Sequence, residues 1–208
     1  MEKIRKKQLA KLLSKLESFK RPKIHLEQYR TPGDVAAELL WIALNDGNIT
    51  DKVIADLGAG TGIISIGASL LGARKVYALE VDENALDIAR KNAEKLNIEN
   101  IIFLVQDISE FNKKVDTAIM NPPFGCQREH ADRAFLEKAF EIAQVVYSIH
   151  ISKEEVRGFL KRFSEDRGFS PQIISSMQFE IPAVFFFHEK RLERIKVDLY
   201  RFSKLIKY

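Results

Sequence analysis

The sequence VIADLGAGTG, residues 53–62, has the pattern of a buried strand that runs directly into a glycine-rich turn. Val53 to Leu57 is a short apolar run, and the apolar segment that begins at Ile63 has the length of a helix. Glycine is needed in such a turn because the backbone takes positive φ angles or approaches a ligand closely. Residues 53–71 therefore predict the first strand and helix of a parallel α/β sheet, with a ligand crevice where the strand ends.

Short apolar runs continue to alternate with helical stretches as far as residue 165. We expect further strands at 75–80, 101–106, 115–120 and 145–151, and further helices at 84–96, 131–142 and 153–165. This alternation indicates a mostly parallel sheet that is covered on both faces. The pattern then predicts strands at 172–179, 184–188 and 195–202, the last two joined by the loop 189–194 as an antiparallel hairpin at the sheet edge.

Two helices are expected before the first strand. Apolar residues at three- and four-residue intervals predict an amphipathic helix over 3–19, and a second helix is expected over 35–44 with Asp34 as its cap. No linker or internal repeat divides the chain. We therefore expect a single domain over 1–208, made of an N-terminal helical extension at 1–50 and a Rossmann-like core at 51–208.

The composition excludes several classes of protein. With 208 residues, 46% of them hydrophobic and 30% charged, the chain is neither disordered nor fibrous. Cys126 is the only cysteine, which excludes an internal disulfide, and the four histidines share no spacing typical of a metal site. No apolar run approaches the roughly 20 residues of a membrane span. We expect a cytoplasmic protein with no metal and no membrane partner.

Charge is distributed unevenly along the chain. Residues 1–30 hold ten Lys or Arg against three Glu, and residues 184–208 hold seven basic residues against three acidic ones, although the whole chain carries only +4. The segment between them is acidic. Basic ends on an acidic body suggest a polyanionic partner, although two solvated helical faces would look similar.

The glycine spacing favours S-adenosyl-L-methionine (SAM) over NAD as the cofactor. A dinucleotide fingerprint that starts at Gly58 would need glycine at position 63, which is Ile63 here. Acidic residues end the next two predicted strands, where they could accept hydrogen bonds from ribose hydroxyls and from an adenine amino group. Asp82 is the alternative acceptor for the ribose hydroxyls. The candidate cofactor residues in this part of the chain are Asp56, Gly58, Gly60, Thr61, Gly62, Glu80, Asp107 and Ile108.

The segment Asn121-Pro122-Pro123-Phe124 is the most specific motif in the chain, and it ends a predicted strand. An exocyclic amine on a purine is a poor nucleophile because its lone pair is delocalised into the ring. The Asn121 side-chain oxygen and the Pro122 carbonyl could accept its two N–H bonds, and Phe124 could stack on the base. Such a site would act through positioning and electrostatics, with no general base. A rigid Pro-Pro turn is the structural alternative, and a nucleophilic Cys126 is disfavoured because it follows Gly125.

With these motifs placed, the sequence resembles the methyltransferase-like protein 5 family of class I SAM-dependent enzymes that methylate adenine N6 in small-subunit ribosomal RNA. The resemblance covers almost the whole chain. It includes Glu27-Gln28-Tyr29-x-Thr31, the glycine loop, residues 82–86, Met120 to Gly125, residues 134–136, 146–150 and 187–188, and Val197-Asp198-Leu199. The resemblance implies a mostly parallel seven-stranded sheet, with residues 121–124 as the catalytic tetrad. It also implies that Gln28, Thr31 and Ile63 join the cofactor site.

The resemblance further implies two kinds of partner. The first is small-subunit rRNA. From the charge distribution, we expect its phosphates to be held by basic residues at both ends of the chain: Lys3, Arg5, Lys6, Lys7, Lys20, Arg21, Lys23, Lys190, Arg191 and Arg194. The second is a small zinc-containing activator of the Trm112 type. The apolar strand 101–106 should lie at a sheet edge and could pair with it, unless a neighbouring loop covers that edge.

Three alternatives remain at this stage. Guanine N2 and the amide nitrogen of a protein glutamine are planar amino nitrogens like adenine N6, and related tetrads act on them. The basic ends favour RNA over a protein substrate but do not separate adenine from guanine. A silent RNA-binding scaffold is the third alternative, against which the intact tetrad and glycine loop argue.

Overall fold

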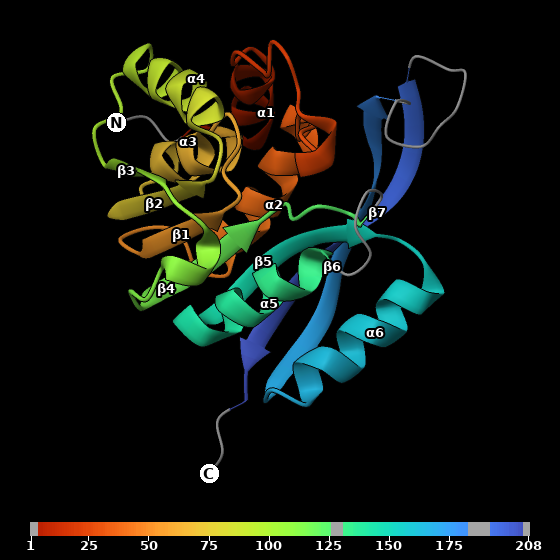
Figure 1. The fold of residues 1–208 in the computed structure, drawn as a ribbon. Coiled ribbons are helices and arrows are strands. Elements are labelled where there is room, and N and C mark those ends of the chain that lie inside the picture. Colours follow the sequence, from red (N-terminus) through yellow and green to blue (C-terminus); the bar gives the residue numbers. More distant parts are fainter. Residues whose placement is uncertain (1–3, 126–130, 183–191, 206–208) are drawn as a thin grey trace.

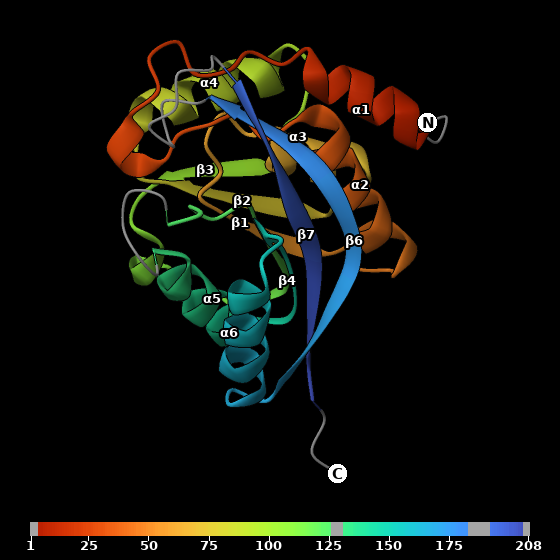
Figure 2. The ribbon, with the colours of Figure 1, turned by 90° about the vertical axis from the view of Figure 1, so that its right-hand side faces the viewer.

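The computed structural model describes residues 4–125, 131–182 and 192–205. It contains one seven-stranded sheet with helices on both faces, as Figures 1 and 2 show. The strands are β1 (Val53–Leu57), β2 (Lys75–Glu80), β3 (Ile101–Val105), β4 (Val115–Met120), β5 (Ala143–Ile151), β6 (Phe169–Pro182) and β7 (Leu192–Lys204). Their order in the sheet is β3-β2-β1-β4-β5-β7-β6.

The first five strands are parallel, and β7 runs antiparallel to both β5 and β6. The expected mostly parallel sheet with an antiparallel C-terminal hairpin at its edge is therefore confirmed. The strand order reverses between β1 and β4, so a crevice opens at the carboxyl ends of these two strands, which is where sheets of this kind bind ligands.

Helices α2 (Gly33–Asn45), α3 (Ile63–Leu70) and α4 (Glu83–Glu94) cover one face of the sheet, while α5 (Ala131–Ile142) and α6 (Glu154–Glu165) cover the other (Figure 1). Alternating side chains of the central strands supply both cores. On β1, Ile54 faces the core beneath α2 and α3, whereas Ala55 and Leu57 face the core beneath α5. Strands that are buried on both faces explain why the sequence shows continuous apolar runs there.

The N-terminal helix is shorter than its apolar pattern predicted. Helix α1 spans Lys6–Ser14 and packs on α2. Its last carbonyls, those of Leu13 and Ser14, accept hydrogen bonds from the Arg30 guanidinium at 3.0 and 2.6 Å. Beyond the helix, the backbone N–H and C=O of Glu17 bond to the side chain of Asn92 on α4. These tertiary contacts end the helix well before Arg21-Pro22.

Three other local expectations need correction. Asp34 lies in the first turn of α2, whose N-cap is Pro32, so Asp34 is not the cap. The strand expected at 172–179 extends over Phe169–Pro182, with a register shift between Ile173 and Ser175. Residues 192–194, expected in the hairpin loop, belong to β7, whereas the strand expected at 184–188 lies outside the described residues.

The crossing from β3 to β4 places acidic side chains beside the crevice. Since β3 is the edge strand and β4 pairs with β1, the chain crosses β2 and β1 without a full helix, using the short 3-10 turn Ile108–Glu110. No helix in the described part of the chain is long and apolar enough to cross a membrane.

Candidate functional site

A cavity of about 480 Å³ lies at the carboxyl ends of β1, β2 and β4, within the size range of small-molecule sites. Residues of the N-terminal extension, the glycine loop, the ends of β2 and β3 and helix α5 form its walls. Most of the site residues expected from the sequence line it, namely Gln28, Thr31, Gly58, Gly60, Thr61, Ile63, Glu80, Asp107, Ile108, Asn121 and Pro123. Asp56, Gly62, Pro122 and Phe124 are the expected residues that lie behind the walls.

The loop between β1 and α3 requires its glycines for conformation and for space. Gly58, Gly60 and Gly62 have φ angles of 74°, 53° and 84°. A Cβ on Gly62 would lie 2.9 Å from the Cβ of Ala89, and one on Gly60 would lie 3.1 Å from the Phe19 ring. The loop therefore packs against α4 on one side and is covered by Phe19 on the other, and Gly62 serves packing rather than the cavity.

Glu80 orders the backbone at the end of β2. One carboxylate oxygen accepts a hydrogen bond from Gly60 N at 2.9 Å, and the other accepts from Val81 N and Asp82 N at 3.0 and 3.1 Å. Burial raises the pKa of Glu80 above its ordinary value, although these three amides act in the opposite direction. A half-buried carboxylate on the cavity wall suits the hydroxyl groups of a ribose.

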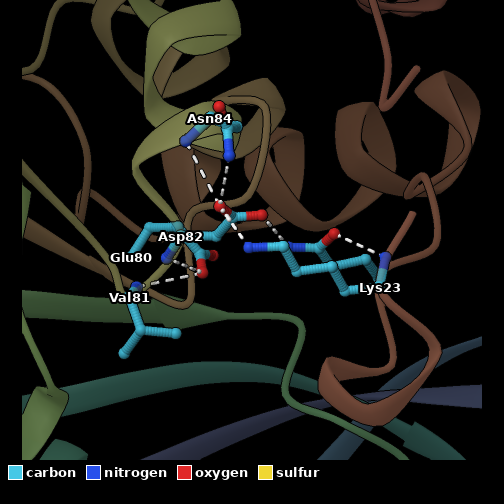
Figure 3. A network of polar contacts seen from close by, with 6 residues as sticks. Lys23, Glu80, Val81, Asp82 and Asn84 are labelled. Atoms are coloured by element: carbon cyan, nitrogen blue, oxygen red, sulfur yellow. Dashed lines mark hydrogen bonds and ion pairs between the residues drawn. The ribbon is translucent and has the colours of Figure 1, made fainter. Parts of the chain in front are cut away.

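Asp82 fastens the N-terminal segment 23–31, which we call the strap, to the end of β2 (Figure 3). Its carboxylate accepts hydrogen bonds from Gln28 Nε2 at 2.7 Å and from Lys23 Nζ at 2.9 Å. Burial alone would raise the pKa of Asp82, but these bonds outweigh it and hold the pKa below its ordinary value. Asp82 therefore closes the strap over the cavity instead of competing with Glu80 for a ligand.

Asp107 and Ile108 stand on the crossing from β3 to β4. A carboxylate oxygen of Asp107 accepts a hydrogen bond from Ser109 N at 2.8 Å and caps the short turn that follows. Hydrogen bonding from Ser109 lowers the pKa of Asp107, so the carboxylate stays ionised. An ionised acceptor on the cavity wall can bind an amino group, as the sequence suggested.

Asn121 has one half of its amide fixed and the other half available. Its Nδ2 donates to Thr31 Oγ1 at 2.9 Å, which sets the orientation of the side chain. Its Oδ1 is buried and has no hydrogen-bond partner among the described residues. A buried acceptor without a partner is costly, so an acceptor held in this way beside a cavity indicates a site for a ligand N–H group.

Pro122 and Phe124 are both in contact with the strap. The hydroxyl of Tyr29 donates to the Pro122 carbonyl at 3.3 Å, and the Tyr29 ring stacks on Phe124 with centroids 5.1 Å apart. Neither residue reaches the cavity wall, whereas Tyr29 does. Of the four tetrad residues, the structure thus places Asn121 and Pro123 on the cavity wall, and Tyr29 lies against the other two.

Asp56 lies beneath the glycine loop and away from the cavity. It is 1% exposed, and one carboxylate oxygen accepts from both Ser65 N and Ser65 Oγ, at 2.9 and 2.6 Å. The other oxygen has no partner among the described residues. Asp56 therefore anchors α3 to β1, and the structure gives it no direct contact with a ligand in the cavity.

The buried carboxyl of Asp56 is expected to give the protein a pH-dependent stability. Burial raises its pKa from 3.8 to about 7, so the folded protein keeps a proton that the unfolded chain has released. Stability should therefore fall as the pH rises from about 4 to about 7, by up to about 1.4 kcal/mol per pH unit. Between pH 5 and pH 7, the free energy of unfolding measured in urea should fall less for Asp56→Asn than for the wild type. An equal loss in both proteins would mean that folded Asp56 is already ionised at pH 5.

Among the cavity residues that were not expected as site residues are three aromatic ones, Phe19, Tyr29 and Phe135 of α5. Phe19 was expected on a helix face, whereas Tyr29 and Phe135 appeared only within the segments that carry the family resemblance, without a role. Phe19 is the last residue in the apolar spacing of the N-terminal segment, and this spacing was the sequence signal that it is partly buried. For Phe135, whose ring lies 3.0 Å from the position of a Gly58 Cβ, the available signal was the segment 134–136 of the family resemblance.

No group of three or more metal-ligating side chains occurs among residues 4–125, 131–182 and 192–205. Cys126, His130 and His188 lie outside these ranges. The residues that line the cavity are instead suited to an uncharged or cationic organic ligand with hydroxyl and amino donors, because carboxylates and an amide oxygen face it.

Comparisons with known proteins show the class and the family of the protein. The family model for the methyltransferase small domain matches residues 30–146. The rRNA N(6)-adenosine-methyltransferase METTL5 of Danio rerio is 37% identical over 95% of this chain and 98% of its own. The crystal structure of PH1948 from Pyrococcus horikoshii, provisionally described as an RNA methyltransferase, is 57% identical, with a TM-score of 0.93 over 98% of this chain and 99% of that one.

A more distant structure shares the fold alone. Magnesium protoporphyrin IX methyltransferase from Synechocystis, solved with bound SAM, is 19% identical, with a TM-score of 0.63 over 81% of this chain and 77% of that one. The fold, the glycine loop and the family model together define a methyltransferase of the SAM-dependent class. Within that class, the chain belongs to the METTL5 family.

Proposed function

We propose that this enzyme transfers the methyl group of SAM to N6 of an adenosine in RNA, and specifically in small-subunit ribosomal RNA. The observation that carries the proposal is the buried Asn121 Oδ1, which has no partner among the described residues and lies beside the cavity. An exocyclic amine supplies the N–H donor that this oxygen lacks. The names of the full-length relatives, which are rRNA adenine-N6 methyltransferases, support adenine and RNA as the target.

The residues that line the cavity are chemically suited to bind SAM. Glu80 and Asp107 offer carboxylates to hydroxyl and amino donors, and Gly58 and Gly60 let the backbone approach closely. The strap, held by the bond from Gln28 to Asp82, forms the opposite wall. When bound, SAM supplies an electrophilic methyl group on a sulfonium.

The chain's own contribution to the reaction is to position the amine. Asn121 Oδ1 and the Pro122 carbonyl accept the two N–H bonds, which favours a pyramidal nitrogen whose lone pair faces the methyl group. A carbon–nitrogen bond forms as the carbon–sulfur bond breaks, and the surplus proton of the methylated amine leaves to water. The target base must leave the RNA stack to reach this position, which favours an accessible RNA region.

The proposal is tested by transfer of labelled methyl from SAM to unmodified small-subunit rRNA, followed by nuclease digestion and identification of the methylated nucleoside. Labelled N6-methyladenosine is the expected product. Labelled N2-methylguanosine would replace adenine N6 with guanine N2 as the target. Binding of SAM without transfer to the RNA would leave methylation of a protein glutamine or a silent scaffold.

The basic residues of the N-terminal segment divide into two groups. Lys6 forms an ion pair with Glu38 at 2.7 Å and Lys23 with Asp82 at 2.9 Å, so both also serve the fold. Exposed Arg5, Lys7, Lys20 and Arg21 remain the better candidates for phosphate contacts. In the C-terminal group, Arg194 pairs with Glu180 at 2.8 Å, and Lys3, Lys190 and Arg191 lie outside the described residues.

We also propose that β3 is the docking edge for a zinc-containing activator of the Trm112 type. Strand β3 is an edge of the sheet, and its Ile102 and Val105 side chains are 38% and 46% exposed. The opposite edge, β6, contains Pro171 and a register shift, both of which discourage the pairing of a further strand. The β3 edge, which is apolar and pairs with β2 without a register shift, therefore suits strand addition.

Replacing Ile102 and Val105 together with lysine should abolish co-purification with such an activator and leave the isolated enzyme more soluble. Lysine on an edge strand opposes the approach of another apolar strand. Ile173→Lys, at an exposed position of β6, is the matched control and should change neither property. Unchanged capture of the activator by the β3 variant would rule out this edge as its site.

A further inference from the structure

The ring of Tyr29 lies against the catalytic tetrad. It is stacked on Phe124, with an interplanar angle of 24°, and its hydroxyl donates to the Pro122 carbonyl. Phe179 of β6 meets both rings edge-on, at 5.7 Å from Tyr29 and 5.5 Å from Phe124. Tyr29 is only 7% exposed, so this is a packed contact within the molecule.

These are the two contacts that the proposed function gives to the target base, namely a stacking face on Phe124 and an N–H bond to the Pro122 carbonyl. Tyr29 lines the cofactor cavity, whereas Pro122 and Phe124 do not. Tyr29 thus borders the cavity and contacts both groups. A base that stacked on the same face of Phe124, with its amine toward the cavity, would overlap the Tyr29 ring.

We propose that Tyr29 holds the target-base position in the RNA-free enzyme and that the incoming adenine displaces it. This inference rests on the proposed function. A phenol resembles an aminopurine in two respects, because it is a flat ring that stacks and it has one strong hydrogen-bond donor. Tyr29 therefore keeps the Pro122 carbonyl satisfied and covers the Phe124 ring until RNA arrives.

The exchange of tyrosine for adenine has a physical driving force. Tyr29 offers a single donor, which bonds to Pro122, and Asn121 Oδ1 is left buried and without a partner among the described residues. An adenine amine carries two N–H groups, so it can satisfy both oxygens at once. Satisfying a buried acceptor recovers the free energy that its desolvation costs, which favours the base that brings the second donor.

The strap determines how Tyr29 can leave. Before Tyr29 in the chain, Gln28 is bonded to Asp82, and after Tyr29 the Thr31 hydroxyl accepts a hydrogen bond from Asn121. These bonds tie the strap to the cofactor wall and to the tetrad. A rotation of the Tyr29 side chain would open the target position while the cofactor wall stays closed.

The experiment compares the kinetics of Tyr29→Phe with those of the wild type on the RNA fragment that contains the methylated adenosine. Tyr29→Phe keeps the ring and removes the hydroxyl that bonds to Pro122, a bond worth about 0.5–1.5 kcal/mol, so KM for the RNA should fall about 2- to 10-fold with kcat and KM for SAM unchanged. Tyr29→Ala should in addition raise methylation of free adenosine. Tyr147→Phe also removes a buried, hydrogen-bonded hydroxyl, one that bonds to Asp46 far from the tetrad, and should leave KM for RNA unchanged.

A second readout does not depend on turnover. In the free enzyme, stacking on Phe124 should change the chemical shifts of the Tyr29 ring in NMR spectra of tyrosine-labelled protein. The Tyr29 signals are assigned by their absence from the spectrum of Tyr29→Phe. Addition of the RNA should abolish this change in chemical shift. A lower kcat or a higher KM for RNA in Tyr29→Phe, or Tyr29 signals that are unchanged in the RNA complex, would make Tyr29 a fixed support of the tetrad and overturn the inference. Absence of transfer by the wild type itself would instead overturn the proposed function, and this inference with it.

Discussion

Replacing Asn121 with alanine is expected to lower the rate of methyl transfer by on the order of 10²–10³-fold, with SAM affinity almost unchanged. The side chain presents an acceptor whose direction is fixed by Thr31, and removing one preorganised hydrogen-bonding group from an active site has effects of this size. Single-turnover transfer to RNA measures the rate, and calorimetric titration with SAM measures the affinity. The difference between the two quantities separates a role in catalysis from a role in cofactor binding.

Thr31→Val is the matched control for the orientation of the amide. Valine has the shape of threonine but cannot accept the bond from Asn121 Nδ2, so the amide loses its fixed direction while its oxygen remains present. A loss of about 2- to 10-fold in transfer rate is expected, smaller than that of Asn121→Ala. Full activity of Asn121→Ala would remove this residue from the mechanism, whatever the behaviour of Thr31→Val.

The sheet could be predicted from the sequence because its strands are local features. The β1 and β4 strands were predicted at their observed bounds, Val53–Leu57 and Val115–Met120, since each is an apolar run buried on both faces. Predictions of this kind depend on neighbouring residues alone.

The end of α1 could not be predicted in this way, because distant residues determine it. The apolar spacing continues to Phe19, yet Arg30 binds the last carbonyls of the helix and Asn92 binds the backbone beyond it. Phe19 can therefore leave the helix and cover Gly60. A periodic pattern records which residues are buried but not whether a helix or a tertiary contact buries them.

The site was predicted for its acidic and amide groups but not for the contacts among them. Glu80, Asp107 and Asn121 were placed at strand ends, and all three line the cavity. Asp56 was grouped with them because it belongs to the same strand and loop, but its side chain points to Ser65 inside the fold. The stacking of Tyr29 on Phe124 joins residues 95 positions apart in the sequence, and no local pattern encodes it.

Replacing Glu80 with alanine is expected to weaken SAM binding by about 10- to 100-fold, because a hydrogen bond to a charged group is worth about 1.5–3 kcal/mol. Glu80 stands on the cavity wall, and it also holds the amides of Gly60, Val81 and Asp82 in place. Its loss therefore removes an acceptor for the ribose and loosens the loop around it. Titration calorimetry measures the change in SAM affinity, and the affinity for RNA should stay unchanged.

The pH dependence of SAM binding separates these two contributions of Glu80. Burial raises its pKa, so the wild-type carboxyl takes up a proton at a higher pH than an ordinary glutamate, and SAM affinity should decline as the pH falls toward that pKa. Glu80→Gln keeps a neutral acceptor of the same size but has no charge to lose, so its weaker affinity should show no such decline. Equal pH profiles for the two proteins would mean that the charge of Glu80 does not act on the ribose, and that Glu80 serves only to order the loop.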